Sequence, residues 1–272
     1  MTTKYKLILN EKSCLGLLSL TDSGQKNSRL KQTAEREARN GYILDTRTVK
    51  HFVEFDITTV LGDIAEGNSC FISSIKSVVS KPERYAYIEE ALKAYFDEQD
   101  YSVRKIEQIL GRYGAAFGEN GKDGTTVYSC SDLQQAVFSI LHFLIVNGFK
   151  FSFCEHCGRQ YATKSLKVIY CNRKSTFSGY ERYSCGEAVK KIKDSLEKRR
   201  ITVYERLRVH ADEYLYSSKY GEQLRDFQNK CTEYKAIIKK SASVSNLQEY
   251  SCYLQNGDGL PKRYERIKER TL

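Results

Sequence analysis

The sequence predicts an α+β fold that is predominantly helical, and three observations support this prediction. Short apolar runs near the N-terminus are typical of strands, helical spacing of apolar residues dominates the rest of the chain, and four cysteines gather in one basic segment. These features divide the 272 residues into three parts: an N-terminal α+β domain over 1–149, a cysteine module with a long basic helix over 150–208, and a helical C-terminal tail over 209–272.

The N-terminal domain begins with two predicted strands, Tyr5–Asn10 and Leu15–Leu20. The stretch over 28–40 is polar and rich in charge, which favours a helix or a mobile segment. Residues 42–60 mix β-branched and aromatic side chains without a clear period, so their secondary structure stays open.

The second half of this domain is predicted to be helical. Pro82 fits the first turn of a helix with apolar residues at three- and four-residue spacing, and a second short helix follows over 103–110. The glycine-rich stretch 113–126 matches no phosphate-binding motif and is predicted to be a loop. A capping-box pattern at Ser131–Gln134 then starts an apolar helix that ends near Gly148.

The cysteine module has the residue pattern of a zinc site. A C-x2-C pair on a tight turn directs two thiolates at one point, and a second pair completes the tetrahedral sulfur shell that suits zinc. Gly158 permits the positive φ of a zinc knuckle, and Tyr161 lies where such knuckles place an aromatic ring over the metal. The sequence therefore predicts one structural Zn2+ bound by Cys154, Cys157, Cys171 and Cys185. Four unrelated thiols in a reduced core are the alternative.

The remainder of the module predicts a treble-clef-like finger. Residues 168–170 are expected to form a short strand that leads to Cys171. Cys185 begins a predicted helix, whose N-terminal dipole stabilises a thiolate. His156 would point away from a metal that both flanking cysteines bind, so we expect it to be exposed.

Positive charge is concentrated in this same module. Residues 151–208 carry fourteen basic and six acidic side chains, a net charge of +8, whereas the whole chain carries +10. Residues 1–150 are balanced, with nineteen side chains of each sign. A local excess of this size indicates a surface for phosphates or acidic partners, and a solvated lysine-rich helix is the plainer alternative.

The helix after Cys185 combines an apolar face with basic side chains. Between Gly186 and Gly221 there is no proline or glycine, so one long helix or two nearly continuous ones are expected. Its apolar face comprises Val189, Ile192, Leu196, Val203 and Leu207. The candidate nucleic-acid contacts in the module are Arg159, Arg173, Lys174, Arg182, Lys190, Lys191, Lys193, Lys198, Arg199 and Arg200. In the tail, a second stripe is predicted at Leu224, Phe227, Cys231, Tyr234 and Ile237.

The module resembles a known class of zinc finger. F-C-x-x-C-G-R-x-Y over 153–161, I-Y-C over 169–171, and C-G at 185–186 before a basic helix resemble the CGNR-type fingers. The pattern is more similar still to a family of bacterial proteins, frequent in Firmicutes and mobile elements, that carry a C-terminal finger of this kind. The resemblance covers about 150–208 and implies zinc and DNA binding. Only Cys185-Gly186 remains of the C-G-N-R signature, and the last two cysteines are more widely spaced.

These features predict a cytoplasmic zinc-finger protein that binds DNA, as a regulator or accessory factor of a bacterial mobile element. The alternative is a zinc-stabilised interaction module for an acidic protein partner. No membrane partner is expected, because the most apolar segment, 136–146, is too short to span a bilayer. The chain contains no H-E-x-x-H, G-x-S-x-G, Walker or dinucleotide motif, so we do not expect an enzyme. An active site of scattered residues is the least favoured alternative.

Overall fold

The structure of the protein is a computed structural model. It describes residues 5–20, 47–49, 52–67, 86–98, 118–121, 124–213 and 218–256, with three single positions at 104, 108 and 111. The predictions for 28–40, for Pro82 and for almost all of 103–110 lie outside the described residues.

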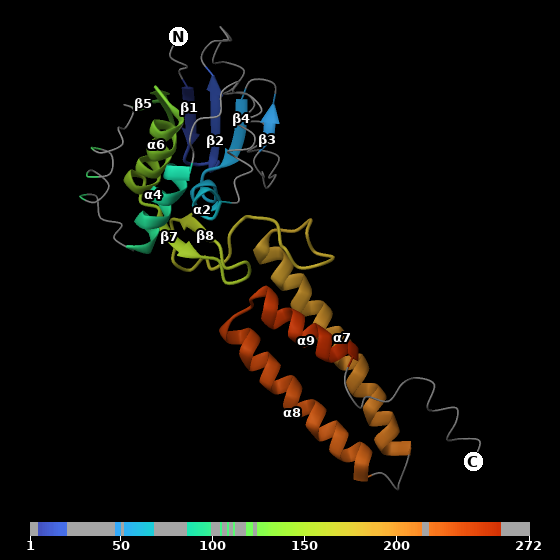
Figure 1. Cartoon of the computed structure of the whole chain (residues 1–272). Coiled ribbons are helices and arrows are strands. Elements are labelled where there is room, and N and C mark those ends of the chain that lie inside the picture. Colours follow the sequence, from blue (N-terminus) through green and yellow to red (C-terminus); the bar gives the residue numbers. More distant parts are fainter. Residues whose placement is uncertain are drawn as a thin grey trace. The chain divides into compact units, whose positions relative to one another are not determined.

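The chain is a mixed α/β protein, as predicted, and it divides into two compact units (Figure 1). Unit 1 contains residues 1–154 and 159–173, and unit 2 contains residues 155–158 and 174–272. The division therefore differs from the three predicted segments: residues 159–173 of the cysteine module fall in unit 1, while its helix and the tail fall in one unit.

Unit 1 is built on a six-stranded antiparallel sheet. The strands are β1 (Tyr5–Asn10), β2 (Leu15–Leu20), β3 (Arg47–Val49), β4 (Phe52–Asp56), β5 (Gly118–Asn120) and β6 (Thr125–Cys130), in the order β3-β4-β2-β1-β6-β5. The first two strands have the predicted bounds. The prediction of a loop over 113–126 is wrong in part, because Gly118–Asn120 pairs with β6.

Three helices of unit 1 are described: α2 (Val60–Ala65), α4 (Ala86–Asp97) and α6 (Leu133–Val146). The apolar helix α6 packs on β1 and β6, and its Phe138 and Leu141 join Leu7, Leu9 and Phe55 of the sheet in the core. Gly148, with φ of 74°, ends this helix as predicted.

The cysteine module begins with a hairpin of β7 (Lys150–Phe153) and β8 (Gln160–Thr163). All four residues of β8 are buried, and β8 contacts α2. The backbone N–H of Ala162 donates to the carbonyl of Thr58 at 2.7 Å, which fixes this strand beside the start of α2.

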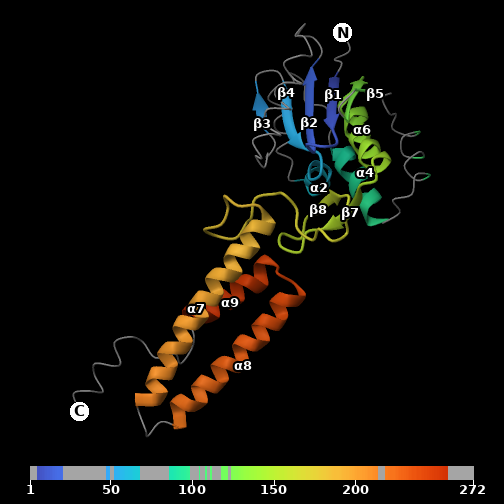
Figure 2. The same ribbon diagram turned by 180° about the vertical axis from the view of Figure 1, so that it is seen from behind.

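Unit 2 contains three long helices, α7 (Cys185–Glu213), α8 (Ser218–Lys240) and α9 (Val244–Asn256). Figure 2 shows that α7 and α8 run antiparallel and that α9 returns between them. The predicted apolar face of α7 is buried. On α8, however, Ile238 is buried and Ile237 is 43% exposed, so the predicted stripe is one residue out of register at its end. Within the described residues, no helix has both the length and the apolar character needed to cross a membrane.

Candidate metal centre and basic helix

The first cysteine pair lies on the turn that connects β7 and β8. The backbone N–H of Cys154 donates to the carbonyl of Arg159 at 2.9 Å, which closes the turn. Gly158 has a φ of 73°, in the left-handed region that glycine adopts at little cost. The positive φ predicted for the knuckle is therefore present.

The second pair comes from a loop and from the start of a helix. Residues 168–170 do not form the predicted strand, and Val168 and Ile169 are exposed. The backbone N–H of Cys171 points at the sulfur of Cys154, with an N–Sγ distance of 3.4 Å. Cys185 is the first residue of α7.

A capping box fixes the helix end that carries Cys185. The backbone N–H of Ser184 donates to Glu187 Oε2 at 3.2 Å, and the backbone N–H of Glu187 returns a bond to Ser184 Oγ at 3.4 Å. The S-x-x-E pattern that encodes this box is visible in the sequence at Ser184–Glu187. The box holds the Cys185 backbone at the first turn of α7.

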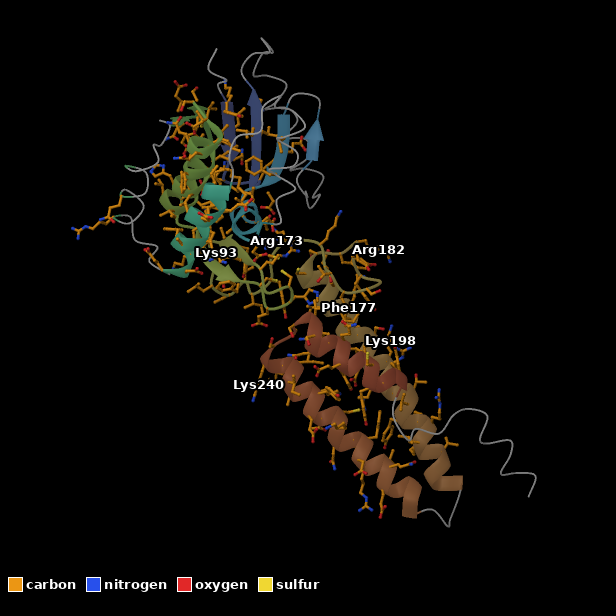
Figure 3. The ribbon with its side chains drawn as sticks, viewed as in Figure 1. Lys93, Arg173, Phe177, Arg182, Lys198 and Lys240 are labelled. Carbon is orange, nitrogen blue, oxygen red and sulfur yellow. The ribbon has the colours of Figure 1, made fainter. Side chains whose placement is uncertain are left out.

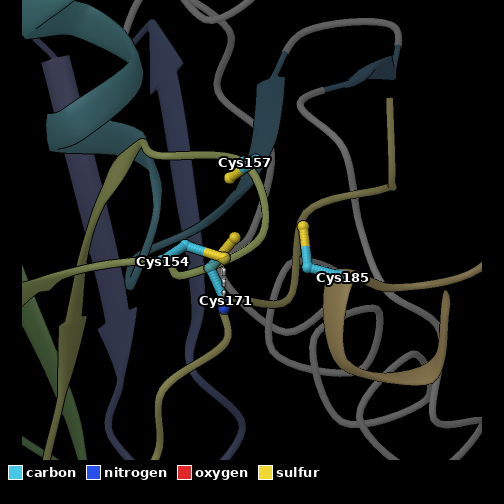
Figure 4. A group of neighbouring side chains, drawn as sticks. All are labelled: Cys154, Cys157, Cys171 and Cys185. Carbon is cyan, nitrogen blue, oxygen red and sulfur yellow. Dashed lines mark hydrogen bonds between the residues drawn. The ribbon is translucent and has the colours of Figure 1, made fainter. Parts of the chain in front are cut away.

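The four predicted cysteines come together in space. Their sulfur atoms all lie within 4.8 Å of one another, and Figure 4 shows the side chains turned toward a common centre. Cys154, Cys171 and Cys185 are buried, while Cys157 is partly exposed. The four thiols are therefore close enough to hold one metal ion.

Arg173, which was predicted to contact nucleic acid, has a structural position instead. Its side chain is only 5% exposed, and its Nε lies 2.7 Å from Asp63 Oδ1. Its Nη2 donates to the carbonyls of Thr59 and Gln160, at 2.8 and 2.7 Å. The prediction for Arg173 is thus wrong, because a guanidinium committed to these partners inside unit 1 does not reach a phosphate at the surface.

Asp63 is the acidic partner of this network. Arg159 Nη1 lies 3.4 Å from the same Oδ1, so two cations of the cysteine module converge on one carboxyl of α2. Burial raises the pKa of Asp63 to about 6, and the charges of Arg173 and Arg159 oppose that shift. Asp63 was not predicted as a partner of the module, because an isolated acid in an apolar stretch carries no local signal.

His156 is also placed differently from its prediction. The ring is 2% exposed, and its Nε2 and Nδ1 lie 2.8 Å from Ser175 Oγ and 3.2 Å from the carbonyl of Ala242. The backbone N–H of Val244 donates to the His156 carbonyl at 3.1 Å. His156 is therefore buried rather than exposed, because it joins the knuckle turn to the connection between α8 and α9.

The remaining basic candidates differ in their accessibility. Arg159 and Arg200 are half-buried and paired with carboxylates, Arg200 with Glu197 at 2.7 Å. The exposed candidates are Lys174, Arg182, Lys190, Lys191, Lys193, Lys198 and Arg199. Figure 3 shows Arg182, Phe177 and Lys198 in unit 2, from the loop before α7 to the middle of that helix.

One face of α7 carries a row of basic side chains, and the exposed acids Asp194 and Glu205 lie beside it. At helical spacing the row reads Lys191, Ser195, Lys198, Arg199, Thr202 and Arg206, and all six residues are exposed. We call this row the basic stripe. Arg206 was not among the predicted contacts, although its spacing from Lys198 and Thr202 indicates the same face.

The loop before α7 places aromatic rings at one end of the basic stripe. Phe177, Tyr180 and Tyr183 form a chain of ring contacts, with centroid distances of 5.8 and 6.3 Å. Lys191 Nζ lies 4.6 Å from the centroid of the Tyr183 ring, and the Arg182 guanidinium lies 4.8 Å from it. The loop and the first turns of α7 thus form one cationic surface within unit 2.

Comparison with known proteins adds no relationship. No protein-family model, no curated protein and no solved structure matches this chain.

Proposed function

We propose that the four cysteines bind one structural Zn2+ in a treble-clef-like finger, and that the loop and basic stripe of α7 bind DNA through its phosphates. The single observation that carries the zinc proposal is the convergence of four sulfur atoms within 4.8 Å. Tetrahedral zinc with Zn–S bonds of about 2.3 Å needs sulfurs roughly 3.8 Å apart, so a small contraction around the ion completes the site.

The chemistry of the donor set also favours zinc. Four thiolates are soft ligands in a tetrahedral arrangement, which suits zinc over magnesium or calcium. The Cys171 N–H directed at the Cys154 sulfur stabilises its thiolate form. Four sulfur ligands leave no open coordination position, so the proposed role of the ion is structural and not catalytic.

The zinc proposal is tested by elemental analysis of the purified chain. We expect one equivalent of zinc, lost in Cys154→Ser and in Cys185→Ser but retained in the control Cys252→Ser, which changes an exposed cysteine outside the cluster. A folded wild-type chain without metal, or equal zinc content in all four proteins, would falsify the site.

The DNA proposal is supported by the arrangement of charge on α7. The apolar face packs against α8 and α9, and the cations of the basic stripe lie on the exposed surface of the helix beside that face. Phosphate contacts of this kind supply affinity without sequence information, and their strength falls steeply with salt. The resemblance of residues 150–208 to the CGNR-type fingers supports the same proposal, with the role of a regulator or accessory factor of a mobile element.

Charge reversal on the basic stripe tests this proposal with a matched control. We expect Lys191→Glu/Lys198→Glu/Arg199→Glu to abolish binding to a short duplex of random sequence while zinc content stays unchanged. The control, Arg225→Glu/Lys239→Glu/Lys240→Glu on α8, makes the same change in net charge at exposed positions and should bind nearly as wild type does. A slope of about −0.9 per phosphate contact is expected in a plot of log affinity against log salt.

The rival function, binding of an acidic protein surface, predicts a different outcome of the same titration. If the wild-type chain has no affinity for duplex DNA at low salt, the DNA proposal fails. If the two triple variants lose affinity equally, net charge and not the basic stripe is responsible.

A further inference from the structure

Unit 1 contains a pocket of about 520 Å³ at the end of the sheet where β1 turns into β2. Figure 1 shows β8 and α2 at the same end of the sheet. The volume of the pocket lies within the range of roughly 300–1,000 Å³ that is usual for sites of small organic ligands. Cys171 of the proposed zinc site is among its lining residues, but neither the zinc nor the DNA proposal gives the cavity itself a role.

The walls of the pocket are mainly aromatic and apolar. Phe149, Tyr161 and Tyr170 line it together with Ala162 and Val168. Tyr161 is buried, and its hydroxyl donates to the carbonyl of Val168, which fixes the ring and the loop that follows β8. These walls offer flat apolar surface to a planar ligand.

The turn between β1 and β2 supplies the polar side of the pocket in a fixed conformation. The backbone N–H of Ser13 donates to Asn10 Oδ1 at 2.9 Å, and the Cys14 thiol donates to the Glu11 carbonyl at 3.7 Å. Cys14 has a φ of 55°, which is unusual for a residue other than glycine and is retained only where surrounding contacts hold it. The turn is therefore preformed, and Lys12 at its centre lines the pocket.

The acidic groups around the pocket already have partners. Glu11 pairs with Lys164, whose ammonium also lies 5.0 Å from the centroid of the Phe149 ring. Asp56 accepts from the N–H and the hydroxyl of Thr58 at 2.7 and 2.6 Å, and from Asn172. Among the described residues, Lys12 forms neither an ion pair nor a side-chain hydrogen bond, so this exposed cation at the edge of the pocket is available to a ligand.

We propose that this pocket binds a small organic anion with a planar aromatic body, whose carboxylate or phosphate pairs with Lys12 while its ring packs between Phe149 and Tyr170. The site would give unit 1 a ligand-binding role of its own. It does not depend on the zinc or the DNA proposal.

The test uses 8-anilinonaphthalene-1-sulfonate as the probe, since it combines an anion with aromatic rings. Fluorescence titration of the full-length, zinc-loaded chain should give one saturable site. Lys12→Glu should weaken binding by roughly tenfold or more, because an attraction becomes a repulsion. The control Lys93→Glu makes the same charge change at an exposed position of α4 and should leave the affinity unchanged.

Two further measurements separate this pocket from non-specific apolar binding. Val168→Trp adds bulk at a pocket residue that is 46% exposed, so it should block the probe without disturbing the core. The uncharged analogue N-phenyl-1-naphthylamine should bind more weakly than the sulfonate. The proposal is overturned if the probe shows no saturable binding, if Lys12→Glu and Lys93→Glu behave alike, if Val168→Trp has no effect, or if the uncharged analogue binds equally well.

Discussion

Arg173 is a single buried cation that holds two elements of unit 1 together. Its guanidinium joins the carbonyls of Thr59 and Gln160 and the carboxylate of Asp63, so one side chain fixes the start of α2 against β8. The backbones are so close there that a Cβ added at Gly62 would lie 2.2 Å from the Gln160 carbonyl oxygen. The residue two positions after Cys171 thereby anchors the loop that delivers this cysteine.

We therefore expect Arg173→Lys to be strongly destabilising, although it keeps the charge. A lysine ammonium cannot donate in the several fixed directions that the guanidinium reaches, and buried carbonyls would lose their donors. The free energy of unfolding, measured by urea denaturation of the zinc-loaded chain, should fall by about 2–4 kcal/mol. Arg159→Lys, at an ion pair of 3.4 Å and partial exposure, is the control and should change it by less than about 1 kcal/mol. Equal effects of the two substitutions would contradict the anchoring role.

Residue roles in the cysteine module were predictable only where the determinant is local. The C-x2-C spacing and Gly158 encode the knuckle within five residues, and the structure has both features. Arg173 and His156 were misassigned because their partners, Asp63 and Ala242, are distant in the sequence. Charge and polarity in a sequence indicate what a side chain can bind, but not whether folding buries it.

At the level of elements, the helices of unit 2 are joined by packing and by one ion-pair network. Glu197 of α7 accepts from Arg200 on the same helix and from Lys235 of α8 at 2.9 Å. The hydrogen bond from Arg200 is the largest cause that lowers the pKa of Glu197 to about 2, and Lys235 adds to it. Tyr234 of α8 stacks on Tyr250 of α9 with a centroid distance of 5.0 Å, so an aromatic contact joins these two helices beside the ion-pair network.

Glu197→Gln is expected to weaken this helix contact modestly and in a pH-dependent way. Because the folded-state pKa lies below the ordinary value of 4.5, the pair stabilises the fold above about pH 4.5. This contribution is lost as the pH falls toward 2, where the carboxylate becomes protonated. At pH 7 the substitution should lower the free energy of unfolding by about 0.5–1 kcal/mol, a small value because the side chain is 42% exposed.

Urea denaturation of both proteins at pH 7 and at pH 3 measures this effect, and the difference between them should shrink at the lower pH. Glu205→Gln is the matched control, because the described part of the chain gives Glu205 one ion-pair partner, Arg208 of its own helix, and both are about half exposed. Its effect should be near zero at either pH. A pH-independent loss in Glu197→Gln would show that shape and not charge joins the helices.

The helices α6 and α8 were predicted from the sequence. The predicted N-cap of α6 and the predicted end of the apolar stripe on α8 were each wrong by one residue, because two adjacent residues fit either position. Ser131 begins the expected capping box, yet Asp132 is the N-cap of α6 and accepts from the N–H of Gln135 at 2.7 Å. Both residues are good caps, and only packing of the helix decides between them. Similarly, helical spacing alone allows Ile237 or Ile238 to continue the stripe of α8, and the position of α7 and α9 selects Ile238.

For the whole molecule, the cysteine cluster is separate from the apolar core of unit 1. The core of unit 1 is formed by the sheet, α2, α4 and α6, and none of the four clustered cysteines belongs to it. The helices of unit 2 bury their own apolar faces, including Leu207, Phe227 and Leu247. The chain therefore differs from small zinc fingers, which depend on the metal for most of their folding free energy.

Removal of the proposed zinc with a chelator should consequently leave most of the secondary structure in place. We expect the far-UV circular dichroism signal to keep most of its helical intensity. Limited trypsin digestion should gain cleavage at Lys174 and Arg182, which lie in the loop between Cys171 and Cys185. The reason is that this loop is held at both ends by a sulfur ligand, whereas the helices are stabilised mainly by their own buried apolar faces. Addition of zinc should restore protection, and magnesium, a poor partner for thiolates, should not. Loss of the greater part of the helical signal on chelation would contradict this prediction, because it would mean that the metal maintains the cores as well as the loop.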